Sequence, residues 1–289
     1  MSLSSVLQTA LSGMGAAEAA IGVIANNLAN SRTTGFKASA AVFATQSPQT
    51  LSLGFAPTGG SGGTNPLQIG SGVQTVTITT DFSQGTIATG SDPSQLALQG
   101  DGFFIVETDG GGLAYTRDRQ FHINGNEELV ATTGDRVLGF GVDSNFQIQT
   151  TELVPLRISV RASAAASDGS AAVLTGFTVE NNGRISGNFS DGVRRTLGQI
   201  QIARFSDPAG LEQRGENLSA TGPNSGLPLV TNPGAVGGAT IVAGATELSN
   251  TDIGQSLVDL TLASVQFRAS AAVFGTASLM FEKLTNLRR

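Results

Sequence analysis

The two ends of the chain place the strongest constraint on its fold. In the first 31 residues, apolar or small side chains recur at alternating intervals of four and three, at Leu3, Leu7, Ala10, Met14, Ala17, Ile21, Ile24 and Leu28. This spacing predicts a helix with a coiled-coil seam, capped near Ser4 and Ser5 and ending near Asn30. Its single charged residue is Glu18. Because an amphipathic helix normally has a charged outer face, we expect other helices to cover this one.

The same periodicity returns near the end of the chain. Asp252 is a good N-cap, with Gln255 three residues later as in a capping box. The seam that follows consists of Ile253, Leu257, Leu260, Ser264, Phe267, Ala271, Phe274, Ser278 and Phe281. We therefore expect the terminal helices to pair in one discontinuous helical domain, built from residues 1–47 and 247–289. Residues 36–47 either prolong the first helix or pack against it.

The middle of the chain has a different pattern. Residues 51–66 are rich in Gly, Ser, Thr and Pro and predict a flexible linker or an exposed loop. From residue 67 the period becomes two, and short β-branched runs alternate with turn dipeptides such as Asn124-Gly125, Asn182-Gly183 and Asp191-Gly192. The fold class is thus α+β, with a β-rich domain over 67–246. Residues 161–173 are a low-complexity hinge between the two β stretches of this domain.

Composition excludes several classes of protein. With 16 Lys+Arg, 22 Asp+Glu and a net charge of -6, the chain has no basic surface to meet phosphates, so we expect no nucleic-acid binding. Charged residues make up 13% of the chain, about half the usual share, which suits a surface buried against neighbours. There is no cysteine for disulfides or thiolate metal sites. No continuous apolar run approaches a membrane span and no cleavable signal pattern is present, so no membrane insertion is expected.

Chemistry-bearing residues are sparse. The single histidine, His122, sits in an alternating stretch and is expected to be a surface or packing residue. The acidic residues Glu127, Glu128 and Asp109 fall at turn tips, where solvated surface is their ordinary role. The glycine clusters at 100–102 and 110–112 lack the Lys-Ser/Thr of a P-loop. We therefore expect no catalytic, cofactor or metal site, and a protein that is not an enzyme.

The run Ala25-Asn26-Asn27-Leu28-Ala29-Asn30 contains three asparagines. Asn30 fits a helix end, where asparagine satisfies free carbonyls or takes the left-handed conformation. Asn26 and Asn27 lie inside the expected helix, although asparagine is a weak helix former. Their amides both donate and accept hydrogen bonds, so we expect them to fix register in a helix contact.

At these residues the chain resembles a known family. ANNLANSRTTGFK at 25–37 closely resembles the N-terminal signature of bacterial flagellar rod and hook proteins. LALQGDGFFIV at 96–106, AYTRDRQFHIN at 114–124, residues 196–218 and residues 247–287 are similar to later segments of the family, in the same order. Residues 177–199 look more like hook proteins and Leu67-Gln68-Ile69-Gly70 more like the distal rod, so hook is slightly favoured although the chain is short for one. The resemblance implies that residues 1–47 with 247–289 form the polymerisation domain and that residues 67–246 form an outer domain, where the middle insertion of hook proteins would have to fit within 145–176. Ser264-Val265-Gln266-Phe267-Arg268 departs from the usual Gln-Arg-aromatic order, so contacts of the family's Arg are not carried over.

The resemblance implies a structural subunit of the flagellar hook, or alternatively of the distal rod, that self-assembles into a helical tube and transmits torque. It implies neighbouring axial and junction proteins as partners, type III export, and a place in the hook or basal-body rod, extracellular or periplasmic. It also implies that the segment 51–66 tunes bending. The expected polymerisation interface comprises Leu3, Leu7, Met14, Ile21, Ile24, Asn26, Asn27, Leu28, Asn30, Gly35, Phe36, Ile253, Leu257, Leu260, Phe267, Phe274 and Phe281. Two other classes stay open: a secreted β-rich adhesin whose helices form a closed oligomer, and a hydrolase with a site in the β domain.

Overall fold

The structure is a computed structural model that describes residues 3–60, 62–90, 92, 94–117, 120–158, 163–165 and 171–286. The chain divides into two compact units. We call residues 1–31, 38–81 and 251–289 the helical unit, and residues 32–37 and 82–250 the β unit.

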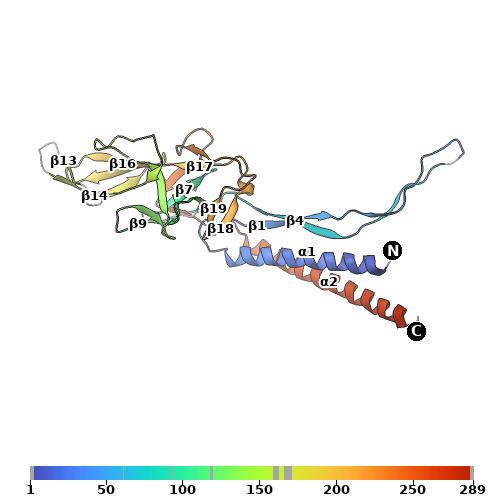
Figure 1. The fold of residues 1–289 in the computed structure, drawn as a ribbon. Helices are drawn as coiled ribbons and strands as arrows, with labels where there is room; N and C mark the ends of the chain where they lie inside the picture. Colours follow the sequence, from blue (N-terminus) through green and yellow to red (C-terminus); the bar gives the residue numbers. More distant parts are fainter. Residues whose placement is uncertain are drawn as a thin grey trace. The chain divides into compact units, whose positions relative to one another are not determined.

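The helical unit contains the two long helices, α1 Leu3–Ala29 and α2 Ile253–Asn286. They lie side by side and run in opposite directions, so that the start of α1 is next to the end of α2 (Figure 1). The N-cap of α2 forms as expected, since the Gln255 amide donates to Asp252 Oδ1 at 3.0 Å. The second half of the capping box is missing, because the Gln255 side chain donates to Asp259 instead.

Residues 38–81 form a long antiparallel arm in the same unit (Figure 1). At its base, β1 Ser39–Thr45 pairs with β4 Val73–Thr80, with a bulge at Val42/Phe43. Further out, β2 Gln49–Ser52 pairs with β3 Leu67–Ile69. Each of these strands has one strand partner among the described residues.

The β unit is built from short antiparallel strands. They are β5 Ile87–Thr89, β6 Leu96–Gln99, β7 Phe103–Glu107, β8 Leu113–Thr116, β9 Phe121–Ile123, β10 Leu129–Ala131, β11 Arg136–Phe140, β12 Val154–Pro155, β13 Ser163–Ala165, β14 Ala171–Val179, β15 Arg184–Phe189, β16 Arg194–Ile200, β17 Ile202–Arg204, β18 Glu212–Gly215, β19 Leu218–Ala220, β20 Leu229–Thr231, β21 Thr240–Ala243 and β22 Ala245–Glu247, with a 3₁₀ turn at Pro208–Gly210. The main sheet has the order β13-β14-β15-β16-β11-β7-β8-β19-β18. β9, β10, β12, β17 and β20 branch from it, while β21 pairs with β6 and β22 with β5.

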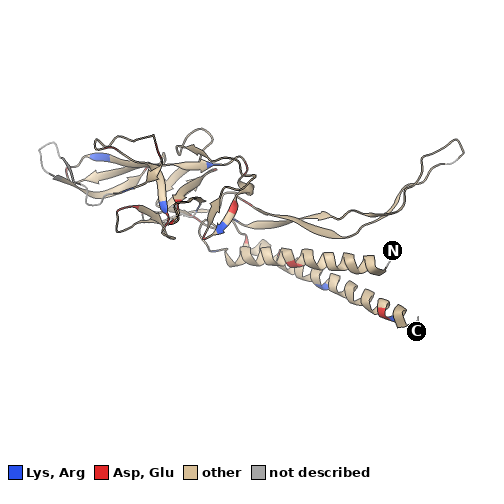
Figure 2. Cartoon of the chain, viewed as in Figure 1, with Lys and Arg blue, Asp and Glu red and all other residues tan. Residues whose placement is uncertain are grey.

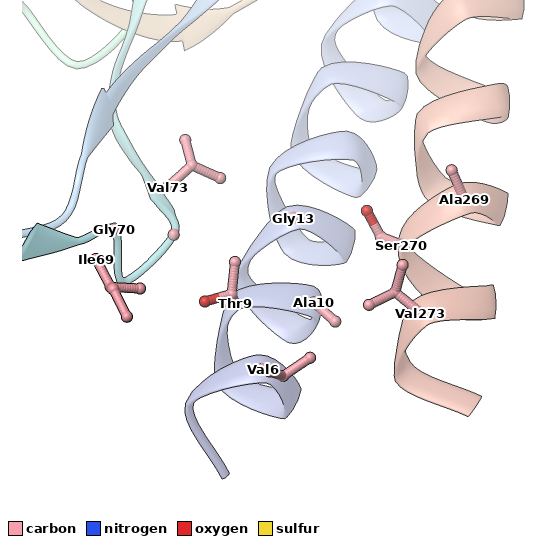
Figure 3. A pocket seen from close by; sticks show the side chains of 11 residues that line it. Val6, Thr9, Ala10, Gly13, Ile69, Gly70, Val73, Ala269, Ser270 and Val273 are labelled. Carbon is pink, nitrogen blue, oxygen red and sulfur yellow. The ribbon is translucent and has the colours of Figure 1, made fainter. Parts of the chain in front are cut away.

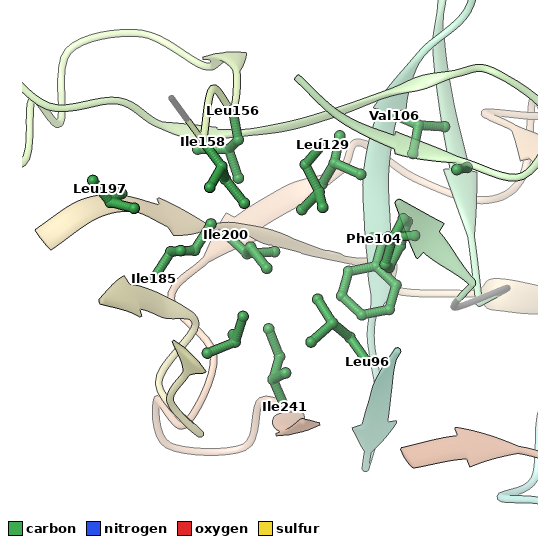
Figure 4. Packing of buried hydrophobic residues seen from close by; sticks show 14 of the residues in the cluster. Leu96, Phe104, Val106, Leu129, Leu156, Ile158, Ile185, Leu197, Ile200 and Ile241 are labelled. Atoms are coloured by element: carbon green, nitrogen blue, oxygen red, sulfur yellow. The ribbon is translucent and has the colours of Figure 1, made fainter. Parts of the chain in front are cut away.

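A continuous apolar core holds the β unit together. Leu96, Phe104, Ile200 and Ile241 are fully buried at its centre (Figure 4). Phe104 meets Phe121 edge to face, with ring centroids 5.0 Å apart. A smaller cluster around Phe103 and Tyr115 completes the core.

Most of the secondary structure agrees with the sequence pattern. The α+β class, with helical termini around a β-rich middle, is confirmed. The turns at Asn182-Gly183 and Asp191-Gly192 form, and both glycines have positive φ, of 80° and 77°. Of the two readings of residues 36–47, packing against the helix is the one observed, because Ser39–Thr45 is strand β1.

One segment differs from the sequence expectation. Residues from 67 to 81 were expected in the outer domain, but they group with the helices because β4 pairs with β1. Of the two readings of residues 51–66, the exposed loop is the one that fits, since the segment forms the outer part of the arm, in which Phe55 and Thr64 exchange two backbone hydrogen bonds. The expected hinge at 161–173 and the insertion at 145–176 lie partly outside the described residues.

Candidate polymerisation surface

The two helices meet through small side chains. Ala10 and Ala17 of α1 are buried, as are Ala263 and Ala277 of α2. A Cβ added at Gly13 would lie 2.9 Å from the Ser270 hydroxyl oxygen, so the helix backbones approach closely at this point. The helix contact within one chain is thus a narrow seam of Ala, Gly and Ser.

This seam corrects the sequence prediction for α2. Ile253, Leu257, Phe274 and Phe281 were expected to pair with α1, but they are exposed, by 56% for Phe281. The row of α2 that meets α1 is instead the heptad of buried Ala263, half-buried Ser270 and buried Ala277, because small residues permit the closer approach. Leu260 and Phe267 are half-buried, as are the larger members of the α1 seam, Leu3, Leu7, Met14, Ile21, Ile24 and Leu28.

Large apolar side chains on the helices consequently face outward. On α2 they include Leu262, Val265, Leu279, Met280 and Leu284, each more than half exposed. Charged side chains are scarce on both helices (Figure 2). Water-exposed helices normally show the opposite distribution, so these surfaces are suited to contact with further apolar helices.

The arm has the same character. From residue 38 to residue 80 the sequence contains no Lys, Arg, Asp or Glu, and Figure 2 shows the described part of this stretch without a charged residue. Leu53 is 83% exposed, and Phe55, Val76 and Ile78 are also exposed. Two-stranded ribbons are marginally stable in water, and free edges without charges invite further pairing. The arm is therefore also a candidate contact surface.

An apolar groove of about 560 Å³ lies between the arm and the helices of this unit. Figure 3 shows Val6, Thr9 and Ala10 of α1 between Ile69 and Val73 of the arm and Val273 of α2. The Val73 amide donates to the Ser12 hydroxyl at 3.2 Å and attaches the arm to α1. The lining offers few polar groups, so the groove is suited to an apolar side chain rather than to a polar small molecule.

Asn27 attaches the end of α1 to the start of β1. Its side chain is buried; its Nδ2 donates to the Ser39 carbonyl at 2.7 Å, and its Oδ1 accepts from the Ser39 amide at 2.9 Å. The Asn27 side chain thus makes the two hydrogen bonds with the Ser39 backbone that a neighbouring strand would otherwise make. Asn27 was expected to fix register between helices; it fixes a helix to a strand.

The other signature residues lie on either side of this contact. Asn26 is exposed, and its main-chain and side-chain oxygens accept from Asn30 Nδ2 at 3.0 and 3.2 Å. Gly35 and Phe36 belong to the β unit. Gly35 has a φ of 68° and donates its amide to the Glu247 carbonyl, while Phe36 is half-buried.

Sequence reasoning missed one important residue of the signature, Lys37. Its ammonium lies in the β unit, 2.5 Å from Glu247 Oε1, with both side chains buried. A signal for this residue was present in the sequence, because the chain has only two lysines and Lys37 is the last residue of the run at 25–37 that carries the resemblance.

The residues with possible chemistry do not converge. His122 is exposed on β9. Glu128 is buried rather than solvated. Its carboxylate accepts a hydrogen bond from Asn124 Nδ2 at 3.2 Å and forms an ion pair with Arg157 at 3.3 Å. The described part of the chain holds no cluster of three His, Cys, Asp or Glu residues that would bind a metal ion.

Helices Leu3–Ala29 and Ile253–Asn286 are long and apolar enough, by length and composition alone, to cross a membrane, with mean hydropathy of 1.2 and 1.3 in an 18-residue window of each. This is compatible with the absence of a continuous apolar run, because interspersed Ala and Leu raise the mean hydropathy without forming one. Helices that are covered by other helices have the same composition.

Known proteins are similar to this chain over nearly its whole length. Residues 97–187 match the family described as the flagellar hook protein FlgE/F/G D1 domain, and residues 7–37 match flagella basal body rod proteins. The flagellar basal-body rod protein FlgG of Bacillus subtilis is 30% identical over 98% of both chains, and that of Borreliella burgdorferi is 30% identical with the same coverage. The flagellar hook protein FlgE of Helicobacter mustelae is 40% identical over 47% of this chain and 31% of its own.

A solved structure, the hook protein FlgE2 of Helicobacter pylori, covers 64% of this chain at 15% identity with a TM-score of 0.24, which is too low to inform the fold. The sequence relationship does not depend on it. The chain belongs to the flagellar axial protein family, which comprises rod and hook proteins.

Proposed function

We propose that this chain polymerises through its helical unit into a segment of the flagellar rod, and that it transmits torque without any chemistry of its own. It is a structural axial subunit of the bacterial flagellum, and its family is a structural one. The observation that carries the proposal is the outward-facing apolar surface of two almost uncharged helices. A monomer gains nothing from such a surface, whereas a tube of helices buries it.

The expected interface residues fit this assembly. Ile253, Leu257, Phe274 and Phe281 are exposed in one chain and so are available to a neighbour. Leu3, Leu7, Met14, Ile21, Ile24 and Leu28 are half-buried and retain part of their surface for the same purpose. A head-to-tail contact between identical subunits that does not close produces an open helical filament.

Alignment coverage supports the rod over the hook. The FlgG rod relative of Bacillus subtilis aligns over 98% of both chains, whereas the hook relative aligns over 47% of this chain and 31% of its own. The hook is the second candidate, favoured by the 40% identity of the matched region. Gold-labelled antibody against the β unit, applied to isolated hook–basal bodies, tests the choice. Label on the rod supports the proposal, and label on the hook replaces it with the second candidate.

Axial flagellar proteins polymerise with themselves and with neighbouring flagellar components. For this chain we add the type III export apparatus as a partner, on the basis of the family resemblance of residues 25–37. Deleting that apparatus in the native host should leave the chain inside the cell. Its appearance in the flagellum of such a strain would contradict this partner.

Sedimentation velocity at increasing concentration tests the assembly itself. An open polymer grows with concentration above a critical value, while a closed oligomer of an adhesin has one size. A single species of constant mass up to high concentration would remove the proposal and favour the closed oligomer.

A further inference from the structure

A buried ion pair joins two segments of the β unit that are 210 residues apart in sequence. Lys37 Nζ donates to Glu247 Oε1 at 2.5 Å and to the Ser83 carbonyl at 2.6 Å. The same Glu247 oxygen accepts from the Gly85 amide at 2.6 Å. We call Lys37, Ser83, Gly85 and Glu247 the clamp. The side chains of Lys37 and Glu247 are 5% and 0% exposed, so the pair is shielded from water.

Backbone contacts reinforce the clamp. The Gly35 amide donates to the Glu247 carbonyl at 3.1 Å, and the Leu248 amide donates to the Thr86 carbonyl at 2.8 Å. A Cβ at Gly85 would lie 2.2 Å from the Leu248 carbonyl oxygen, so only glycine fits this approach. Three separate segments, 32–37, 82–86 and 247–250, are therefore held at one place.

The clamp is cooperative for an electrostatic reason. A buried charge without its partner is strongly disfavoured, and a buried pair is tolerated only when further hydrogen bonds satisfy it. Lys37 needs Glu247 and Ser83, while Glu247 needs Lys37 and Gly85. No two of the three segments form the clamp without the third.

Each clamp segment continues along the chain into the helical unit. Strand β1 begins two residues after Lys37, β4 ends three residues before Ser83, and α2 begins six residues after Glu247. Helix α1 ends six residues before Gly35. Along the chain, the clamp segments thus adjoin the end of α1, the start of β1, the end of β4 and the start of α2.

We propose that the clamp is a folding checkpoint that makes pairing of α1 with α2 depend on a completed β unit. The helices meet only through a narrow seam of small residues, so their pairing gains from the high effective concentration that a fixed origin gives them. A chain with an open clamp keeps its β core but loses the paired helices. Pairing of the two helices is thereby delayed until the β unit is complete. The effect on assembly rests on the proposed function.

Lysine chemistry tests the coupling directly, because Lys37 and Lys283 are the only lysines. Lys283 is exposed on α2 and serves as the internal reference. The full chain, kept below the polymerisation threshold, is treated with an amine-acetylating reagent, and each site is followed by mass spectrometry. Coupling between two events is reciprocal, so disturbing the helix seam must open the clamp.

Gly13→Leu disturbs the seam, because Gly13 faces Ser270, whereas Gly15→Leu on the same helix meets nothing within 4 Å. We expect Gly13→Leu to accelerate Lys37 acetylation about 10-fold relative to Lys283, within the usual range for coupled sites, and Gly15→Leu to leave it unchanged. Equal Lys37 rates in Gly13→Leu and in the unmodified chain would overturn the checkpoint.

Lys37→Met tests the reverse direction, with Arg136→Met as the control at the partly exposed pair Arg136–Glu107. Fluorescence of the single tyrosine, Tyr115, which is buried in the β unit, reports whether that unit stays folded. We expect Lys37→Met to keep the tyrosine signal while its threshold for polymerisation rises at least 10-fold. A folded Lys37→Met chain that polymerises normally contradicts the checkpoint and leaves the proposed function intact. If Lys37→Met unfolds the β unit, the Lys37 acetylation rates of Gly13→Leu and Gly15→Leu decide whether the clamp and the helix seam are coupled.

Discussion

Asn27 provides a quantitative test of how the helix is joined to the arm. Its side chain makes two hydrogen bonds to the Ser39 backbone, at 2.7 and 2.9 Å. Each is worth about 1 kcal/mol net. Replacing Asn27 by alanine therefore costs about 2 kcal/mol of local stability, because Ser39 is half-buried and water replaces part of what is lost.

The neighbouring Asn26 is the matched control. It is exposed, and the contact its side chain loses on substitution is the one from Asn30 at 3.2 Å. Both substitutions gain the same helix propensity, so this contribution cancels in the comparison. Hydrogen exchange of the Ser39 amide is the assay. We expect about 30-fold faster exchange in Asn27→Ala, since about 1.4 kcal/mol corresponds to a factor of ten, and near-unchanged exchange in Asn26→Ala.

Asn27→Asp adds a dependence on pH. The introduced carboxylate still accepts from the Ser39 amide but faces the Ser39 carbonyl without a proton to donate, so its pKa rises on folding. A carboxyl group whose pKa is higher in the folded state stabilises the fold at pH values below its unfolded-state pKa of about 3.9. This stabilisation is lost as the pH rises through the folded-state pKa. Ser39 exchange, corrected for its intrinsic pH dependence, should then be slow in acid and fast at neutral pH. Equal protection in Asn27→Ala and Asn26→Ala, with no pH effect in Asn27→Asp, would refute the reasoning.

Three further predictions concern the two units. Gly15→Leu should raise the thermal midpoint of helix circular dichroism through a propensity gain of about 0.8 kcal/mol, while Gly13→Leu should lower it because overpacking against Ser270 costs about 1–3 kcal/mol; equal midpoints would contradict the small-residue seam. Phe104→Ala should destabilise the β unit by about 3–5 kcal/mol, measured by urea titration of Tyr115 fluorescence, whereas Phe55→Ala on the exposed arm should leave that transition in place. The Arg195 hydrogen bond lowers the pKa of Asp191, so the stability it contributes is present above the unfolded pKa and is lost as pH falls through the lower folded one; Asp191→Asn should remove this part of the acid dependence of the urea midpoint, and an unchanged acid profile would count against the pair.

Local patterns in the sequence determined much of the fold. Heptad spacing located α1 and α2 to within one or two residues at most ends, because a helix is specified by residues close in sequence. The hairpin turns were also predictable, since Asn182-Gly183 and Asp191-Gly192 have the backbone freedom that tight turns require.

The helix contact was not predictable from the same rule. Both helices carry a large apolar row and a row of small residues, and periodicity does not say which row faces the intramolecular partner. The row of small residues forms the contact, because the helix backbones approach closely at Gly13 and Ser270. The large row at Ile253, Leu257 and Phe274 remained outside.

Long-range pairings were equally hidden. Nothing local relates Lys37 to Glu247 or β1 to β4, since these contacts depend on the path of the whole chain. Asn27 was identified as unusual, but its partner was misjudged, because a side-chain amide satisfies a strand backbone as readily as a neighbouring helix.

The central claim is that the terminal helices drive polymerisation while the β unit folds by itself. Deleting residues 1–30 tests it most directly, because the deletion removes α1 and keeps Arg32–Lys37, which belong to the β unit. We expect a soluble chain with native Tyr115 fluorescence that sediments at constant mass at every concentration. Tubes formed by this truncated chain would contradict the account.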